Sequence, residues 1–171
     1  MDQVADYISR VETAIHRAEN NITKLTEKQF GVGGMSSRKV RIFLNEMIKE
    51  DTNYLEIGVW CGSTFIAALH ENPHKSAIAI DDFSEFTAEF YLSECKNGDD
   101  IMRLAEMSVL EEVVAVGDNL FLKNCHKNEI SNFNLIESDC FNLTQSNLDL
   151  IKDINVYLYD GGHSEEEQRK A

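Results

Sequence analysis

Apolar side chains recur every three or four residues near the start of the chain, which is the spacing of one helix face. Residues 4–25 carry them in an a/d heptad stripe, formed by Val4, Ile8, Val11, Ile15, Ala18, Ile22 and Leu25. This stripe predicts a helix that packs either on its own domain or on a second subunit. Asn20 and Asn21 favour the end of that helix.

A glycine-rich segment at 31–34 separates this helix from the next. The glycines match neither a Walker loop nor G-x-G-x-x-G, and we interpret them as a flexible joint. The joint completes an N-terminal helical arm, residues 1–35, and the main domain is expected at 36–171. Ser36 and Ser37 are candidate N-caps of a second helix, which opens this domain.

From residue 53 the pattern changes to short apolar runs separated by helical segments. Such runs are typical of strands that are covered on both faces of a parallel sheet. Strands are predicted at 54–58, 77–80, 133–136 and 154–159, with helices from about 62, over most of 87–117 and at about 118–127. Alternation of strands and helices implies βαβ units. We therefore expect an α/β fold, a Rossmann-like parallel sheet of about four strands with N-terminal helices.

The composition of the chain indicates which classes of binding partner to exclude. The 171 residues hold 16 basic and 30 acidic side chains, a net charge of −14. This charge repels a phosphate backbone and argues against nucleic acid as a partner. Neither a membrane span nor a signal peptide is visible, so we expect no membrane partner, a cytoplasmic location and four reduced cysteines.

Polar and glycine residues follow each predicted strand, and the carboxyl ends of parallel strands form the ligand edge of such sheets. Gly58 and Gly62 allow a ligand close to the backbone, and the helix near Gly62 offers free N–H groups to a carboxylate. Asp81 ends the second strand, where an acid can accept both hydrogen bonds from a ribose diol. Trp60 stands where a dinucleotide site needs its second glycine. The pattern favours a single-nucleoside ligand over NAD.

Each predicted strand and the residues that follow it form one segment. In chain order the four segments are YLEIGVWCGST (54–64), AIAIDDF (77–83), NLIESDCFN (134–142) and VYLYDGGHSEEE (156–167). Together they resemble the motifs of class I S-adenosylmethionine-dependent methyltransferases, above all the branch with macrocin-type sugar O-methyltransferases and catechol O-methyltransferase. The resemblance covers residues 36–170, with a weak match over 87–117. It implies methyl transfer from S-adenosylmethionine to a hydroxyl of a small molecule or sugar. A non-catalytic nucleoside-binding or interaction module is the alternative.

The resemblance implies a role for each matching position. At the methionine end of the cofactor the positions are Glu56, Gly58, Trp60 and Gly62, with Ser63 or Thr64 for its carboxylate. At the ribose and adenine they are Asp81, Asp82, Phe83, Asp139 and Cys140.

Asp160 and His163 are the candidate catalytic residues. Methyl transfer requires that the acceptor be positioned and that its proton be removed, and a histidine can take up a proton near neutral pH. His163 stands three residues after Asp160, where the catechol-type enzymes have a lysine base. The resemblance also implies Asp160 as one ligand of Mg²⁺, an ion that prefers oxygen ligands.

The family's sheet continues beyond a fourth strand, whereas this sequence ends at Ala171. We therefore expect a truncated chain, or one that forms a homo-oligomer through its N-terminal helix or the exposed edge of the fourth strand.

Overall fold

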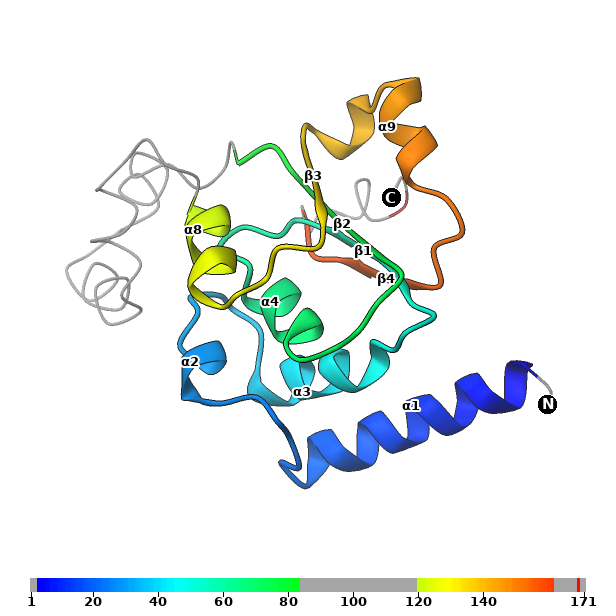
Figure 1. Cartoon of the computed structure of the whole chain (residues 1–171), viewed down its shortest axis with the longest axis vertical. Coiled ribbons are helices and arrows are strands. Elements are labelled where there is room, and N and C mark those ends of the chain that lie inside the picture. Colours follow the sequence, from blue (N-terminus) through cyan, green and yellow to red (C-terminus); the bar gives the residue numbers. More distant parts are fainter. Residues whose placement is uncertain (1–2, 84–119, 162–168, 170–171) are drawn as a thin grey trace.

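The computed structural model describes residues 3–83, 120–161 and 169, and these form a four-stranded, all-parallel sheet. The strands are β1 (Asn53–Ile57), β2 (Ser76–Asp81), β3 (Asn134–Glu137) and β4 (Val156–Tyr159), in the spatial order β3-β2-β1-β4 (Figure 1). This arrangement confirms the expected Rossmann-like α/β fold. The helix predicted over most of 87–117 lies outside the described residues.

The strand order reverses beside β1, because β1 pairs with β2 on one side and with β4 on the other. Ile57 stands opposite Ile80 of β2 and opposite Tyr159 of β4. The carboxyl ends of these three strands are thus level with one another. A reversal of this kind leaves a crevice at the carboxyl ends of the strands, where ligands bind in open α/β sheets.

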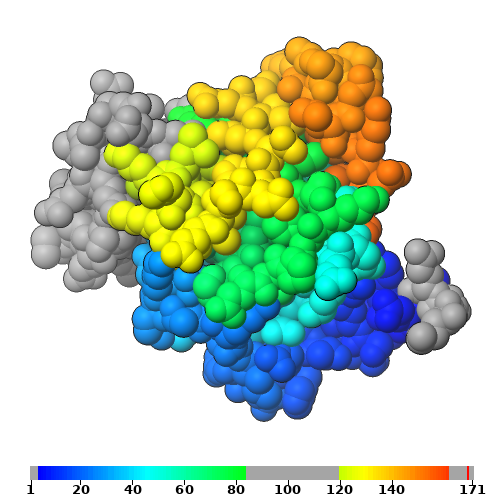
Figure 2. Space-filling model, viewed as in Figure 1, coloured from blue at the N-terminus to red at the C-terminus, as the bar shows by residue number. Residues whose placement is uncertain are grey.

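Two layers of helix cover the sheet. One face carries α1 (Gln3–Glu19), α2 (Glu27–Phe30), α3 (Arg38–Met47), α4 (Ser63–Leu69) and α8 (Leu120–Lys127). The other face carries the 3-10 turn η1 (Cys140–Asn142) and the residues on either side of α9 (Gln145–Leu150), namely Leu143 and Ile151. In the space-filling view the N-terminal helices form the lower part of the molecule and the α9 region its upper part (Figure 2).

Alternation along β1 assigns its side chains to the two layers. Tyr54 is fully buried under the α3 and α4 layer, while Leu55 belongs to the cluster on the η1 side of the sheet, which includes Cys140. The first layer also holds three phenylalanine rings in edge-to-face contact, Phe65, Phe121 and Phe133, with centroids 5.3–5.5 Å apart. This cluster fixes α8 against α4 and the start of β3.

Local signals explain the helix ends. α1 stops at Glu19, followed by Asn21 with φ of 52°, which confirms the predicted break. The side chain of Ser37 accepts a hydrogen bond from the backbone N–H of Val40 and caps α3, as expected. The short helix α2 is not predicted by hydrophobic spacing. Its signal is a capping box between Thr26 and Gln29.

The heptad stripe of α1 divides between two environments. Ala14 and Ala18 are buried against the rest of the domain, whereas Ile8 and Ile15 are 54% and 50% exposed. The packing on its own domain is therefore present, and the outer half of the stripe faces solvent. Likewise β4 pairs only with β1 among the described strands. Association of two copies through either feature stays a prediction.

In the part of the chain that the structure describes, no helix has the length and apolar character needed to cross a bilayer. Three of the four cysteines, Cys61, Cys125 and Cys140, are described, and all three are free thiols. The expected cytoplasmic location stays a prediction.

Candidate functional site

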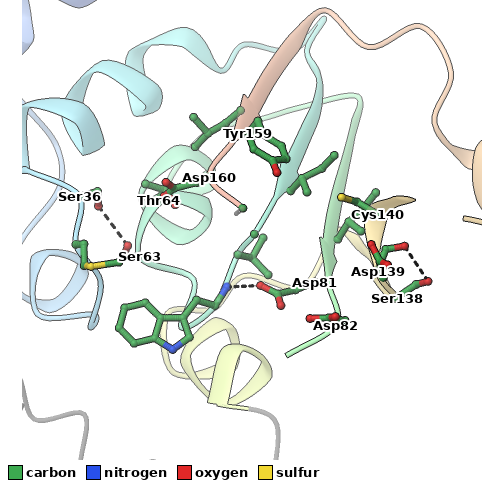
Figure 3. Close-up of a pocket in the computed structure, with 18 of the residues that line it drawn as sticks. Ser36, Ser63, Thr64, Asp81, Asp82, Ser138, Asp139, Cys140, Tyr159 and Asp160 are labelled. Carbon is green, nitrogen blue, oxygen red and sulfur yellow. Dashed lines mark hydrogen bonds between the residues drawn. The ribbon is translucent and has the colours of Figure 1, made fainter. Parts of the chain in front are cut away.

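A cavity of about 860 Å³ opens at the carboxyl ends of the four strands, at the reversal of strand order. Nine of the predicted site residues line it: Gly58, Trp60, Ser63, Thr64, Asp81, Asp82, Asp139, Cys140 and Asp160. Figure 3 shows Asp81, Asp139 and Asp160, from the carboxyl-terminal sides of three different strands, around this cavity. The topology therefore brings together positions that lie up to about one hundred residues apart in sequence.

The carboxylate of Asp81, at the end of β2, is held by the backbone N–H groups of Trp60 and Phe83, with a further contribution from that of Val59. Its Oδ2 lies 2.7 Å from the nitrogen of Trp60, and its Oδ1 lies 2.7 Å from the nitrogen of Phe83. Burial raises the pKa of Asp81, and the backbone N–H groups of Trp60, Phe83 and Val59 counteract the rise. Each carboxylate oxygen can accept two hydrogen bonds. With three backbone N–H groups directed at it, the carboxylate keeps acceptor capacity for at least one ligand hydroxyl.

Both residues that donate to Asp81 have an uncommon backbone conformation. Trp60 has φ of 43° and Phe83 has φ of 53°, in the left-handed region that non-glycine residues rarely adopt. Such strain persists where the surroundings impose it and often accompanies a binding site. Here it aims two N–H groups at one carboxylate and so fixes its orientation. Phe83 itself does not line the cavity, and its ring packs towards Phe121 at 6.3 Å.

Carboxylates dominate the charge of the cavity wall. Asp81, Asp82, Asp139 and Asp160 line it, and no lysine, arginine or histidine occurs among the described lining residues. Asp139 also caps η1, because its Oδ1 accepts from the backbone N–H of Phe141 at 2.9 Å. A wall of this composition attracts a cationic ligand and repels a pyrophosphate.

Glu56 does not line the cavity, although the resemblance placed it at the methionine end. Its side chain is fully buried below the cavity floor and accepts hydrogen bonds from the hydroxyls of Tyr54 and Thr64. Burial raises the pKa of Glu56 to about 8, a rise that these two bonds oppose. Glu56 therefore acts on a ligand only through Thr64, which does line the wall.

The two glycines of the first motif have different roles. A Cβ on Gly58, where φ is 83°, would lie 2.4 Å from the carbonyl oxygen of Asp160. Gly58 therefore lets the ends of β1 and β4 approach each other at the cavity. A Cβ on Gly62 would lie 2.9 Å from the ring of Phe121. Gly62 permits core packing and is not part of the cavity wall.

One wall of the cavity comes from residues that the sequence did not assign to the site. Met35, Ser36, Ser37 and Val40 line it, and the Ser36 hydroxyl lies 3.2 Å from the Ser63 hydroxyl. This wall spans the expected boundary between residues 35 and 36. The sequence predicted Ser36 and Ser37 only as helix N-caps, because no binding motif includes them.

The predicted metal and base cannot be assembled from the described residues. His163 lies outside them, and among them no group of three or more His, Cys, Asp or Glu side chains is placed to hold a metal ion. Asp160 as a ligand of Mg²⁺ therefore stays a prediction, and we derive no step through a metal.

Comparisons of the chain with protein-family models, with curated proteins and with solved structures found no significant match. The geometry of the cavity is therefore the basis for any functional conclusion.

Proposed function

We propose that the chain binds S-adenosylmethionine and transfers its methyl group to a hydroxyl of a small molecule, such as a sugar. The observation that carries this proposal is the Asp81 carboxylate at the end of β2, which backbone N–H groups hold on the cavity wall. The acceptor capacity that remains on this carboxylate suits a hydroxyl of a ribose.

The charge of the cavity supports a sulfonium ligand over a dinucleotide. Four aspartates line it without a lysine, arginine or histidine among the described lining residues. A sulfonium cation is attracted by this wall, whereas the two phosphates of NAD are repelled. Trp60 adds a bulky side chain where a dinucleotide site requires glycine.

When bound, S-adenosylmethionine supplies an electrophilic methyl group on a positively charged sulfur. The acceptor oxygen forms the new bond to the methyl carbon, the carbon–sulfur pair stays with sulfur, and the acceptor hydroxyl loses one proton. In this proposal Asp81 holds the ribose, and His163 takes up the released proton. The cavity contributes chiefly by orienting the two reactants.

Calorimetric titration with S-adenosylhomocysteine tests the proposal. We expect the wild-type protein to bind it, and Asp81→Asn to weaken binding about tenfold or more, because a charged acceptor pair is replaced by an amide. Asp149→Asn is the matched control, since Asp149 is exposed on α9 and pairs with Lys152. No heat from a folded wild-type protein would refute the proposal.

Transfer of a labelled methyl group from S-adenosylmethionine to a panel of hydroxylated sugars separates catalysis from binding. We expect transfer by the wild type and its loss in His163→Ala. Binding of S-adenosylhomocysteine without transfer to any acceptor would instead favour the non-catalytic nucleoside-binding module. Binding of NADH, seen as quenching of Trp60 fluorescence, would point to an oxidoreductase.

A further inference from the structure

Glu56 is a buried acid that the proposed mechanism leaves unused. Its two oxygens accept hydrogen bonds from different hydroxyls, Oε2 from that of Tyr54 and Oε1 from that of Thr64. Tyr54 belongs to the hydrophobic core, whereas Thr64 lines the cavity. In the described part of the chain, Thr64 therefore joins this carboxyl group to whatever the cavity binds.

The proton of Glu56 decides which way the Thr64 hydroxyl points. A carboxylate can only accept, so both hydroxyls direct their hydrogens at an ionised Glu56, whereas a neutral Glu56 has one hydrogen to donate. The Tyr54 hydroxyl is fully buried and has no other acceptor among the described residues, so its hydrogen stays directed at Glu56. The acid hydrogen therefore goes to the Thr64 oxygen, and the hydrogen of Thr64 itself turns towards the cavity.

Charges on the cavity wall influence this proton. Burial raises the pKa of Glu56 to about 8, against the two hydroxyl donors. The carboxylates of Asp160 and Asp81, which line the cavity with Thr64 (Figure 3), add to the rise. An acid with a pKa of about 8 is about nine-tenths protonated at pH 7. A cation among the same aspartates acts in the opposite direction and favours the ionised form.

The other titratable groups around Glu56 come from three further elements and from β1 itself. Burial raises the pKa of Tyr54 on β1, and it raises that of Cys125 on α8 to about 12, so both groups are neutral near pH 7. Asp81 and Asp160 follow from the ends of β2 and β4. All four groups are present in the wild type and in Glu56→Gln alike, so a difference between these two proteins reports on Glu56.

We propose that Glu56 is a positioning residue that adjusts Thr64 to the charge of the ligand: it holds a proton when the cavity contains a neutral sulfur and releases that proton when a sulfonium cation binds. Ionised Glu56 draws the Thr64 hydrogen away from the cavity and leaves a lone pair of the Thr64 oxygen for the cation. This inference rests on the proposed function, and it adds that binding of S-adenosylmethionine, unlike binding of S-adenosylhomocysteine, releases a proton from Glu56.

The released proton has a route that needs no other group. The O–H bond of Glu56 breaks, and its proton passes to the Thr64 oxygen, which is its hydrogen-bond partner. Thr64 gives up its own hydrogen on the cavity side, and the buffer takes up that proton. The hydroxyl of Thr64 is restored, and Glu56 is left as a carboxylate.

Calorimetric titrations at pH 7 in phosphate and in Tris, two buffers with different heats of ionisation, measure the protons released on binding. With S-adenosylmethionine we expect the wild type to release about 0.5 proton or more beyond the release by Glu56→Gln, and with S-adenosylhomocysteine we expect agreement within about 0.2 proton. The amino group of each ligand titrates equally with both proteins. Glu12→Gln, an exposed change on α1, is the matched control and should behave as the wild type.

Two substitutions of Thr64 separate its hydroxyl from its packing. Thr64→Ser keeps the hydroxyl and should keep the proton release. Thr64→Val keeps the shape and should reduce the release by about half or more, because the ionised acid loses a donor. A role in packing alone predicts the reverse order, since valine fills the site of threonine better than serine does. Equal release by the wild type and Glu56→Gln, or by the two Thr64 variants, would overturn the inference.

Infrared spectra of the wild type provide a second measurement that does not depend on the folding of a variant. The carbonyl band of a protonated carboxylic acid is separate from the bands of a carboxylate. We expect this band to diminish when S-adenosylmethionine binds at pH 7 and to persist with S-adenosylhomocysteine. A band that responds equally to both ligands would contradict the inference.

The proton of Glu56 can also be judged separately from the proposed function. If the wild type binds neither nucleoside, the methyltransferase proposal fails, and trimethylsulfonium, a sulfonium without the nucleoside, becomes the probe of the same infrared band. Sodium chloride at equal ionic strength is its control. A loss of the band with trimethylsulfonium alone would still support a proton on Glu56 that responds to a cation in the cavity. A band that trimethylsulfonium leaves unchanged would exclude it.

Discussion

Glu56 gives the most direct prediction about stability, because its carboxyl group is fully buried between Tyr54 and Thr64. The substitution Glu56→Gln keeps the shape and the hydrogen bonding of the protonated acid and removes its titration. Burial raises the pKa of Glu56 from an ordinary 4.5 to about 8 in the folded chain. Between these values the folded state binds one proton that the unfolded state has released.

The sign and size of the effect follow from this difference. Raising the pH through the interval lowers the free energy of unfolding by about 1.4 kcal/mol per pH unit, because unfolding releases the proton. The whole interval from 4.5 to about 8 corresponds to about 5 kcal/mol. The stability contributed by the neutral acid is complete below pH 4.5 and is lost as the pH approaches 8.

Urea unfolding at pH 5, 6, 7 and 8, followed by the single tryptophan, measures this slope. We expect wild type to lose about 4 kcal/mol over this range relative to Glu56→Gln. Other titrating groups, such as His70, are present in both proteins. Their effect on the free energy of unfolding therefore cancels when the wild type is compared with Glu56→Gln. Glu12→Gln changes an exposed residue of α1 and should follow the wild type. Equal slopes for wild type and Glu56→Gln would refute the reasoning.

Two further predictions concern the cavity and the core beside it. Gly58→Ala should lower the free energy of unfolding by about 2 kcal/mol or more, because a left-handed residue gains a Cβ that meets the Asp160 carbonyl at 2.4 Å. Gly31→Ala, at φ of −76°, should cost less in the same urea titration. Phe121→Ala should cost about 3–5 kcal/mol, since its fully buried ring packs against three other phenylalanine rings. In the same assay Phe141→Ala should cost much less, because Phe141 is 41% exposed.

The sheet could be predicted because its strands are continuous apolar runs. The run 77–80 became β2 (Ser76–Asp81) and the run 154–159 became β4 (Val156–Tyr159), since few other structures bury such segments. The helix α9 was not predicted, because residues 145–150 carry only two apolar side chains. Its signal is the capping box between Thr144 and Asn147.

The part of the site formed by residues at the carboxyl ends of the strands was predictable, because the parallel sheet alone brings these residues together. Asp81, Asp139 and Asp160 end parallel strands, so their meeting at one cavity follows from the sheet. The position of Glu56 was not predictable, because alternation along β1 places it on a buried face, one residue before the cavity wall. A strand motif identifies a loop as a ligand site but does not say which of its side chains point away.

The wall at Ser36 was hidden for a different reason. Pattern analysis assigns charged and amide side chains of a helix to solvent, yet Arg41 and Asn45, four residues apart on α3, are both buried. Arg41 holds the segment before the helix by its carbonyl groups, and Asn45 donates to the carbonyl oxygens of Ala67 and His70 near the end of α4. α3 thereby attaches the N-terminal segment to the helix that carries Ser63. Because Met35, Ser36 and Ser37 line the cavity, the segment that α3 attaches in this way forms one wall of the site.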